Sequence, residues 1–163
     1  MTKVHVGVGS NINPKKNLRL AIQKLQERFG ALNISPVYKS NSVGFVGEDF
    51  LNLVIGFVTY ESIENVLKII ETLHQISGRK KTREKFLSRA LDIDLLLYGD
   101  LIYKSELVTI PRPDILEYSF VLKPLSVVAP DIIHPQTKKT IQEHWQIMNK
   151  KKNSLEIIDL EIT

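Results

Sequence analysis

The chain has 163 residues, of which 43% are hydrophobic and 25% are charged, and its formal net charge is +4. This length and balance are typical of one folded domain with a real core, which excludes wholesale disorder. The absence of cysteine excludes a disulfide framework and a thiolate metal site. We expect no signal peptide and no membrane span, because no apolar run approaches transmembrane length. The modest positive charge is compatible with nucleic acid or with a small polyphosphate.

Strand and helix patterns alternate in the first half of the chain. A period of two residues indicates a strand, and a period of 3.6 residues indicates a helix. In chain order the pattern predicts a strand over 3–8, a helix over 14–29, strands over 32–40 and 50–60, and a helix over 61–77. We expect Asn13 to cap the first helix and Pro14 to take its first position. We expect Pro36 to interrupt or begin the second strand.

Residues 89–98 predict a further strand, which the turn at Gly99 and Asp100 ends. On a strand, Asp92 and Asp94 point to the same face, roughly 6.5–7 Å apart. Two carboxylates on the core side of an apolar strand repel each other unless something positive lies between them. A pair of divalent metal ions, ~3.5–4 Å apart, suits that gap. The alternative is an exposed edge strand whose two aspartates simply face water.

The order strand–helix–strand–strand–helix–strand is the split βαβ arrangement of ferredoxin-like sheets. Beyond residue 100 we expect a short strand over 108–110, a partly helical segment over 115–128 that is broken or bent near Pro124, and a helix over 140–148. Residues 155–162 predict a strand or a loose tail. We therefore expect a single domain over 1–163, with a tail after about residue 150.

The connection over 78–89 is strongly basic, with six positive side chains against one negative. It lacks apolar periodicity, so we expect a surface loop. One interpretation is a solvated loop, which is the usual outcome for a charge run. The other is a lid that closes over polyphosphate. A basic lid next to a strand with paired carboxylates suits phosphoryl transfer, in which acids hold Mg²⁺ and cations hold phosphate oxygens.

Several short motifs occur together in an order that resembles one family. They are Gly9-Ser10-Asn11, Phe50-Leu51-Asn52, Gly78-Arg79, the stretch from Arg89 to Gly99, Ile110-Pro111-Arg112-Pro113, and the stretch from Phe120 to Leu125. As far as about Pro135, the chain resembles the 6-hydroxymethyl-7,8-dihydropterin pyrophosphokinases of folate synthesis. The resemblance implies an α+β fold, with a ferredoxin-like βαββαβ core in a three-layer α-β-α sandwich and a mainly antiparallel sheet. It also implies transfer of pyrophosphate from ATP to the hydroxymethyl group of a reduced pterin, with release of AMP.

The same resemblance implies roles for individual residues. Asp92 and Asp94 match the ligands of two Mg²⁺ ions, and Arg79 and Arg89 join them as catalytic residues. The positions that match pterin contacts are Ser40, Val43, Phe50, Asn52 and Phe120. The positions that match ATP contacts are His74, Arg79, Lys81, Arg89, Ile93, Thr109, Arg112 and Tyr118. On spacing alone Phe50 and Phe120 fit core positions equally well, whereas a buried Asn52 amide needs hydrogen-bond partners.

The chain departs from the family pattern on the ATP side. His74 stands where the family usually has glutamate, Arg112 where it has histidine, and Tyr118 where it has arginine. Lys81 replaces a lid arginine, which keeps the charge but loses the bidentate fork. We expect Arg112 to supply the cation missing at Tyr118.

Two other functions remain open on the sequence. A divergent pterin-binding protein with weak or no kinase activity explains the altered ATP side. A ferredoxin-like RNA-binding module explains the element order, but the chain lacks the aromatic strand signature and such a module has no use for Asp92 and Asp94. We expect the partners to be ATP and a reduced pterin, without nucleic acid or membrane, and the protein to be a cytoplasmic monomer.

Overall fold

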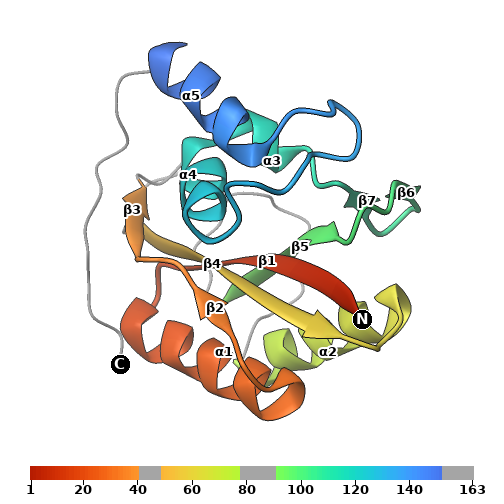
Figure 1. Ribbon diagram of the computed structural model, residues 1–163. Coiled ribbons are helices and arrows are strands. Elements are labelled where there is room, and N and C mark those ends of the chain that lie inside the picture. The colour runs from red at the N-terminus through yellow and green to blue at the C-terminus, as the bar shows by residue number, and fades with distance from the viewer. Residues whose placement is uncertain (41–48, 78–90, 152–163) are drawn as a thin grey trace.

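A computed structural model describes residues 1–40, 49–77 and 91–151, and its centre is a five-stranded antiparallel sheet (Figure 1). Across the sheet the order is β2 (Asn33–Ile34), β4 (Phe50–Thr59), β1 (Thr2–Ser10) and β5 (Asp92–Tyr98), and β3 (Tyr38–Ser40) also pairs with β4. Two short strands, β6 (Tyr103–Lys104) and β7 (Thr109–Ile110), form a separate antiparallel pair. The predicted α+β fold with a mainly antiparallel sheet is confirmed.

Helices cover both faces of this sheet, which gives the three layers that were predicted (Figure 1). On one face lie α1 (Pro14–Phe29) and α2 (Ile63–Ile76). On the other lie α3 (Asp114–Glu117), α4 (Ser119–Val128) and α5 (Ile141–Lys151). Each interface has its own apolar core. The larger core lies under α1 and α2, and the smaller joins β4 and β5 to the helices of the other layer.

The central strand β1 is buried because it pairs on both sides, with β4 and with β5. Val4, Val6 and Val8 alternate along it, and each is at most 2% exposed in the core under α1 and α2. The opposite face of the same strand carries Gly7 and Gly9, because successive strand residues point to opposite faces. On the α4 side, this end of β1 therefore carries no side chains at Gly7 and Gly9, so a ligand can approach the backbone.

The structure bears out the interruption expected at Pro36 and corrects the cap expected at Asn13. The predicted strand over 32–40 is split into β2 and β3 around Pro36, which has no N–H for the ladder. At the break, Ser35 accepts the Val54 N–H through its Oγ at 2.9 Å, so the side chain replaces a backbone partner. Asn13 precedes α1 in a left-handed conformation and its side chain makes no capping hydrogen bond.

The helix is not broken at Pro124, which was one of the two outcomes expected there. The break in this segment lies at Tyr118, whose extended backbone (φ −121°, ψ 126°) separates α3 from α4. Pro124 lies inside α4 and is buried against the sheet. Tertiary packing therefore holds the helix through a residue that, in isolation, would interrupt it.

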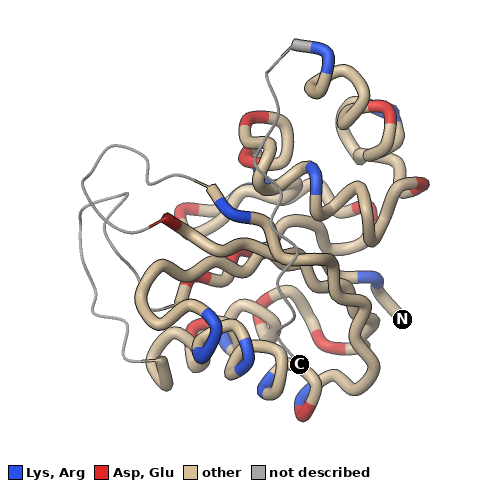
Figure 2. Tube along the Cα trace, turned by 90° about the vertical axis from the view of Figure 1, so that its left-hand side faces the viewer, with Lys and Arg blue, Asp and Glu red and all other residues tan. Residues whose placement is uncertain are grey.

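The outer face of α1 is basic. Its buried residues line one side, and Lys15, Lys16, Arg19, Lys24 and Arg28 lie elsewhere on the helix, where Figure 2 shows basic residues along the lower layer. Two of them are paired, Lys24 with Glu27 at 3.4 Å and Arg28 with Glu61 at 2.6 Å. Within the ranges that the structure describes, we find no helix with the length and apolarity that a membrane span requires.

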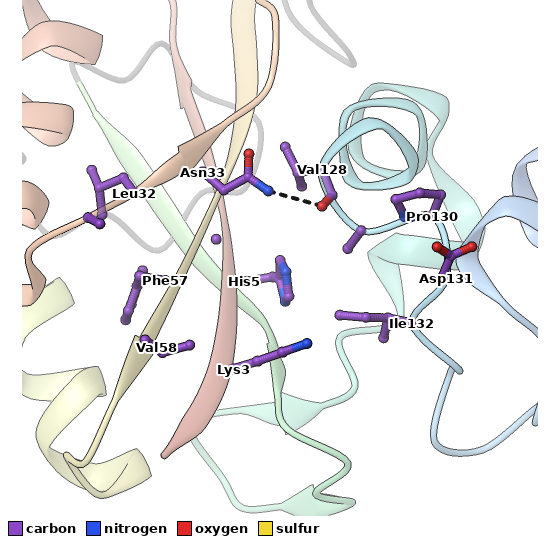
Figure 3. A pocket seen from close by; sticks show the side chains of 13 residues that line it. Lys3, His5, Leu32, Asn33, Phe57, Val58, Val128, Pro130, Asp131 and Ile132 are labelled. Carbon is purple, nitrogen blue, oxygen red and sulfur yellow. Dashed lines mark hydrogen bonds between the residues drawn. The ribbon is translucent and has the colours of Figure 1, made fainter.

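A hollow of about 580 Å³ lies where β1 begins, between the sheet and the turn that follows α4 (Figure 3). Asn33 closes one side by donating from Nδ2 to the Val128 carbonyl at 3.1 Å. His5 lines the floor over Gly56 and is only 6% exposed. Burial, and then the positive charge of Lys3, lowers the pKa of His5 to about 4. Among the described residues, none of those predicted to bind substrate lines this hollow.

We expect His5 to make the fold sensitive to acid. Its pKa is about 4 in the folded chain against 6.5 as the ordinary value, so between these values the unfolded chain binds the extra proton. The stabilisation is complete above pH 6.5 and is lost as the pH falls to about 4, by up to about 3 kcal/mol. Urea unfolding at pH 4.5, inside that window, and at pH 7.5, about one unit above it, should show a smaller pH effect in His5→Gln. An NMR titration placing the imidazole pKa near its ordinary value would contradict this.

Candidate functional site

Pairing register brings a side-chain amide and a carboxylate to the same row of the sheet. Gly9 of β1 lies opposite Asn52 of β4 on one side and opposite Asp92 of β5 on the other. Directly opposed residues of antiparallel strands point to the same face. Adjacent strands lie about 4.7–4.9 Å apart, so Asn52 and Asp92 stand roughly 9–10 Å apart across Gly9. The next row repeats the pattern with Gly7 between Val54 and Asp94.

Glycine at position 9 leaves room for two neighbours from β4. A Cβ at this position would lie 2.9 Å from Asn52 Oδ1 and 3.8 Å from Phe50 Cδ1. Asn52 is 9% exposed, and its Nδ2 donates to Ser40 Oγ at 2.7 Å. Ser40 itself pairs with Phe50 across β3 and β4. Three residues predicted to bind the pterin therefore meet around Gly9, which the prediction did not include. The signal for it in the sequence was a glycine near the end of a strand in which valine occupies every second position.

The two aspartates share one face of β5, as predicted. Ile93 and Leu95 are each 2% exposed in the core under α1 and α2, and Asp92 and Asp94 alternate with them. In the described part of the chain β5 is an edge strand, as the alternative interpretation proposed. The carboxylates are nevertheless half-buried rather than open to water. The side chain of Ile93 points away from them, so a contact of Ile93 with a nucleotide would use its backbone.

Arg112 lies beside these carboxylates and faces two acidic partners. Its Nη2 is 3.6 Å from Asp94 Oδ1, and its Nε is 3.2 Å from Asp114 Oδ2. The second contact is an ion pair rather than a well-aligned hydrogen bond. Burial favours a lower pKa for Arg112, but Asp94, Asp114 and Asp92 together raise the pKa of the guanidinium above its ordinary value. The Arg112 N–H donates to the Leu96 carbonyl at 3.0 Å, which attaches this segment to β5.

His74 supports the strand from the α2 side. It is 7% exposed, and its Nε2 accepts the N–H of Ile93, the residue between the two aspartates, at 2.9 Å. A nitrogen that accepts has no proton, so a neutral ring carries its proton on Nδ1. Nδ1 lies 3.5 Å from Glu71 Oε2. The histidine thus satisfies a backbone donor on the edge strand, a role that its predicted contact with ATP did not include.

The remaining predicted residues fall into two groups. Tyr118 and Phe120 lie side by side at the start of α4, with ring centroids 5.0 Å apart and an interplanar angle of 24°. The C-terminal end of the same helix meets β2, where Asn33 donates to the Val128 carbonyl. Thr109 lies in β7 and is half-buried. Val43, Arg79, Lys81 and Arg89 lie outside the described residues.

The donor set suits a hard divalent cation. Mg²⁺ prefers oxygen ligands, keeps several waters, and is commonly held by one or two carboxylates together with substrate phosphates. Asp92 and Asp94 supply two such carboxylates on one face of β5. Across residues 1–40, 49–77 and 91–151, no group of three or more histidine and acidic side chains forms a complete metal cage. The site therefore fits a metal that a nucleotide helps to bind better than a metal held by protein alone.

Comparison with known sequences gives consistent names. Residues 5–130 match the family described as 7,8-dihydro-6-hydroxymethylpterin-pyrophosphokinase. A protein of Aquifex aeolicus named 2-amino-4-hydroxy-6-hydroxymethyldihydropteridine pyrophosphokinase is 35% identical over 145 residues, which cover 88% of this chain and 90% of that protein. The protein of the same name from Haemophilus influenzae is 30% identical over 142 residues, covering 85% and 88%.

Other matches are much longer than this chain. The folic acid synthesis protein fol1 of Schizosaccharomyces pombe is 36% identical over 143 residues, which cover 85% of this chain but 19% of that protein. A crystal structure of Plasmodium falciparum HPPK-DHPS with pterin and p-hydroxybenzoate has a TM-score of 0.75 at 14% identity, covering 96% of this chain and 45% of that one. The chain thus spans about a fifth of the length of fol1 and less than half of the length of the Plasmodium falciparum chain. At 14% identity, the structural match supports the fold alone.

The hydrogen bond from Ile93 to His74 should contribute to stability. In His74→Leu the Ile93 N–H loses its acceptor while it remains buried, so we expect a loss of about 1–3 kcal/mol in the free energy of unfolding. Glu71→Gln is the matched control, because the Glu71 side chain is 56% exposed and such pairs contribute little. Urea unfolding measures both variants. Equal stability of His74→Leu and the unsubstituted protein would show that this contact does not hold the strand.

Proposed function

The chain belongs to the 7,8-dihydro-6-hydroxymethylpterin-pyrophosphokinase family, and on this basis we propose that it transfers pyrophosphate from ATP to the hydroxymethyl group of 6-hydroxymethyl-7,8-dihydropterin in folate synthesis. The observation that most supports this activity is the row Asn52–Gly9–Asp92, because it places a group for reading a heterocycle and a group for binding metal on one face. AMP is the second product.

At the pterin end, the proposal uses the residues around Gly9. A flat heterocycle with donors and acceptors on its edge needs a side-chain amide and an aromatic surface. Asn52 provides the amide, held by its hydrogen bond to Ser40, and Phe50 provides a ring beside it. We assign Phe120 to the opposite side of the heterocycle. Val43, which lies outside the described residues, would add a further contact.

At the phosphate end, Asp92 and Asp94 would hold Mg²⁺, two ions in our proposal, and ATP is the co-substrate. The metal supplies charge neutralisation at the phosphate oxygens. The hydroxyl oxygen of the pterin would form a bond to the β-phosphorus and give up its proton to solvent. The bond from that phosphorus to the α,β-bridging oxygen breaks at the same time, so AMP leaves. The protein contributes mainly position and positive charge in such a transfer. We assign contacts with ATP to His74, Arg79, Lys81, Arg89, Ile93, Thr109, Arg112 and Tyr118, of which the arginines and the lysine would supply the positive charge.

The proposal limits the partners to ATP and the reduced pterin. Neither nucleic acid nor membrane is needed by a site built from an amide, aromatic rings and two carboxylates. We keep a monomeric state and a cytoplasmic location as parts of the same proposal, to be checked by light scattering and by fractionation of cells.

Activity should depend on the two aspartates. With ATP, hydroxymethyldihydropterin and MgCl₂, a coupled assay should detect AMP, and Asp92→Asn or Asp94→Asn should lower kcat about a hundredfold or more, because each removes charge at the transferring group. Asp100→Asn is the control, since Asp100 is exposed in the turn after the same strand. Pterin binding without any AMP from the unsubstituted protein would favour a divergent pterin-binding protein instead.

Gly9→Ala should weaken pterin binding selectively. The new methyl group would lie 2.9 Å from Asn52 Oδ1 and displace the amide. Loss of one hydrogen-bonding contact of about 1.4 kcal/mol corresponds to about tenfold weaker binding. Gly7→Ala is the comparison, because its methyl group would meet Leu96 at an ordinary 3.6 Å. Calorimetry with the pterin alone measures both, and an unchanged affinity in Gly9→Ala would contradict the assignment of Asn52.

A further inference from the structure

Arg112 already occupies the position of a cation beside the proposed metal ligands. Its guanidinium is 3.6 Å from Asp94 and 3.2 Å from Asp114, and the side chains of Arg112 and Asp94 are 31% and 32% exposed. Asp92 adds to the negative field around the guanidinium. A positive charge in this position reduces the repulsion between the carboxylates, which was the reason for expecting a metal there.

We propose that Arg112 is the built-in counter-cation of Asp94, and that a divalent cation must displace it before the guanidinium can turn to the nucleotide phosphates. This inference rests on the proposed function, because it takes Asp92 and Asp94 as metal ligands and ATP as the co-substrate. The metal and Arg112 compete for one carboxylate when no nucleotide is present. When nucleotide is present they no longer compete, since phosphate oxygens accept the guanidinium that the metal releases.

The attachment of Arg112 allows this exchange without loss of the residue from the site. Its backbone N–H stays bonded to the Leu96 carbonyl, and its Nε lies against Asp114. Only the contact to Asp94 has to break, and the five donors of a guanidinium allow one edge to keep Asp114 while another binds phosphate. The remaining exposed part of the side chain faces solvent, where a polyphosphate can reach it.

This exchange couples the binding of metal and nucleotide. A metal that releases Arg112 from Asp94 raises the affinity for the nucleotide phosphates. By linkage, a nucleotide that binds Arg112 raises the affinity for the metal, because it removes a competitor for Asp94. The coupling therefore depends on a residue that differs from the family pattern, in which histidine is usual at this position. A histidine is shorter and can lose its charge near neutral pH, so it cannot compete in the same way.

The size of the competition follows from the exposure of the pair. Partly exposed ion pairs contribute up to about 1 kcal/mol, which corresponds to about a fivefold change in affinity. In the absence of nucleotide, Arg112→Gln should therefore bind Mg²⁺ about two- to fivefold more tightly than the unsubstituted protein. The same variant should bind the nucleotide at least about fivefold more weakly, because it lacks a charged phosphate donor.

Calorimetry separates these effects. The unsubstituted protein, Arg112→Gln, Arg112→Lys and Lys139→Gln are each titrated with MgCl₂ alone and then with α,β-methylene-ATP at saturating MgCl₂. Lys139→Gln removes the same charge from an exposed lysine before α5, so it controls for the net charge of the protein. Opposite changes in the two affinities in Arg112→Gln, little change in Lys139→Gln, and an intermediate result for Arg112→Lys would support the exchange.

The possible failures are distinguishable. If Arg112→Gln and the unsubstituted protein bind Mg²⁺ equally and the nucleotide affinity falls, Arg112 is a phosphate ligand only and the competition is overturned. If Arg112→Gln binds Mg²⁺ more weakly, the guanidinium positions Asp94 for the metal, which also overturns the proposal. If no protein binds Mg²⁺ with or without nucleotide, the metal site of the proposed function itself fails.

Discussion

The pairing register of β1 between β4 and β5 is the constraint on which the site depends. Val4, Val6 and Val8 are buried under α1 and α2, so a slip of one residue would turn them toward the opposite face. The burial of these valines therefore fixes where Gly9 lies, and with it the partners of Gly9 on both sides. The amide of Asn52 and the carboxylate of Asp92 share a row because the core on the other face allows no alternative register.

The strand β5, which carries Asp92 and Asp94, is placed at the edge of the described sheet, which gives ligands access but leaves part of its backbone to be satisfied by other groups. His74 meets this need from α2 by accepting the Ile93 N–H. Arg112 meets it from the segment after β7 by donating to the Leu96 carbonyl. Both residues depart from the family pattern, and both hold the strand that carries Asp92 and Asp94. The residues at positions 74 and 112 therefore affect how β5 is held in place as well as how a ligand is bound.

The fold alone does not choose a function, because ferredoxin-like sheets serve unrelated activities. The two ends of the α4 face differ in chemistry. At one end the Asn52 amide and the Phe50 ring lie beside Gly9, and Asp92 lies opposite Gly9 on the next strand. At the other end a neutral, buried His5 lies in a mostly apolar hollow, which none of the predicted site residues in the described ranges lines (Figure 3). The contrast favours an enzyme of polar, phosphorylated substrates over a module that binds RNA across an aromatic sheet.

Local patterns in the sequence were sufficient for most elements, for the common face of Asp92 and Asp94, and for the family. These depend on residues a few positions apart, where strand alternation and helical periodicity act directly. The tertiary structure alone decided that Gly9 is the neighbour of Asn52, that His74 accepts a hydrogen bond from β5, that Arg112 faces Asp94, and that the chain breaks at Tyr118 instead of Pro124. Each of these features joins segments that are distant in the chain or depends on packing against the sheet. The pairing register is set by the burial of whole strands and not by the few site residues that the register brings together.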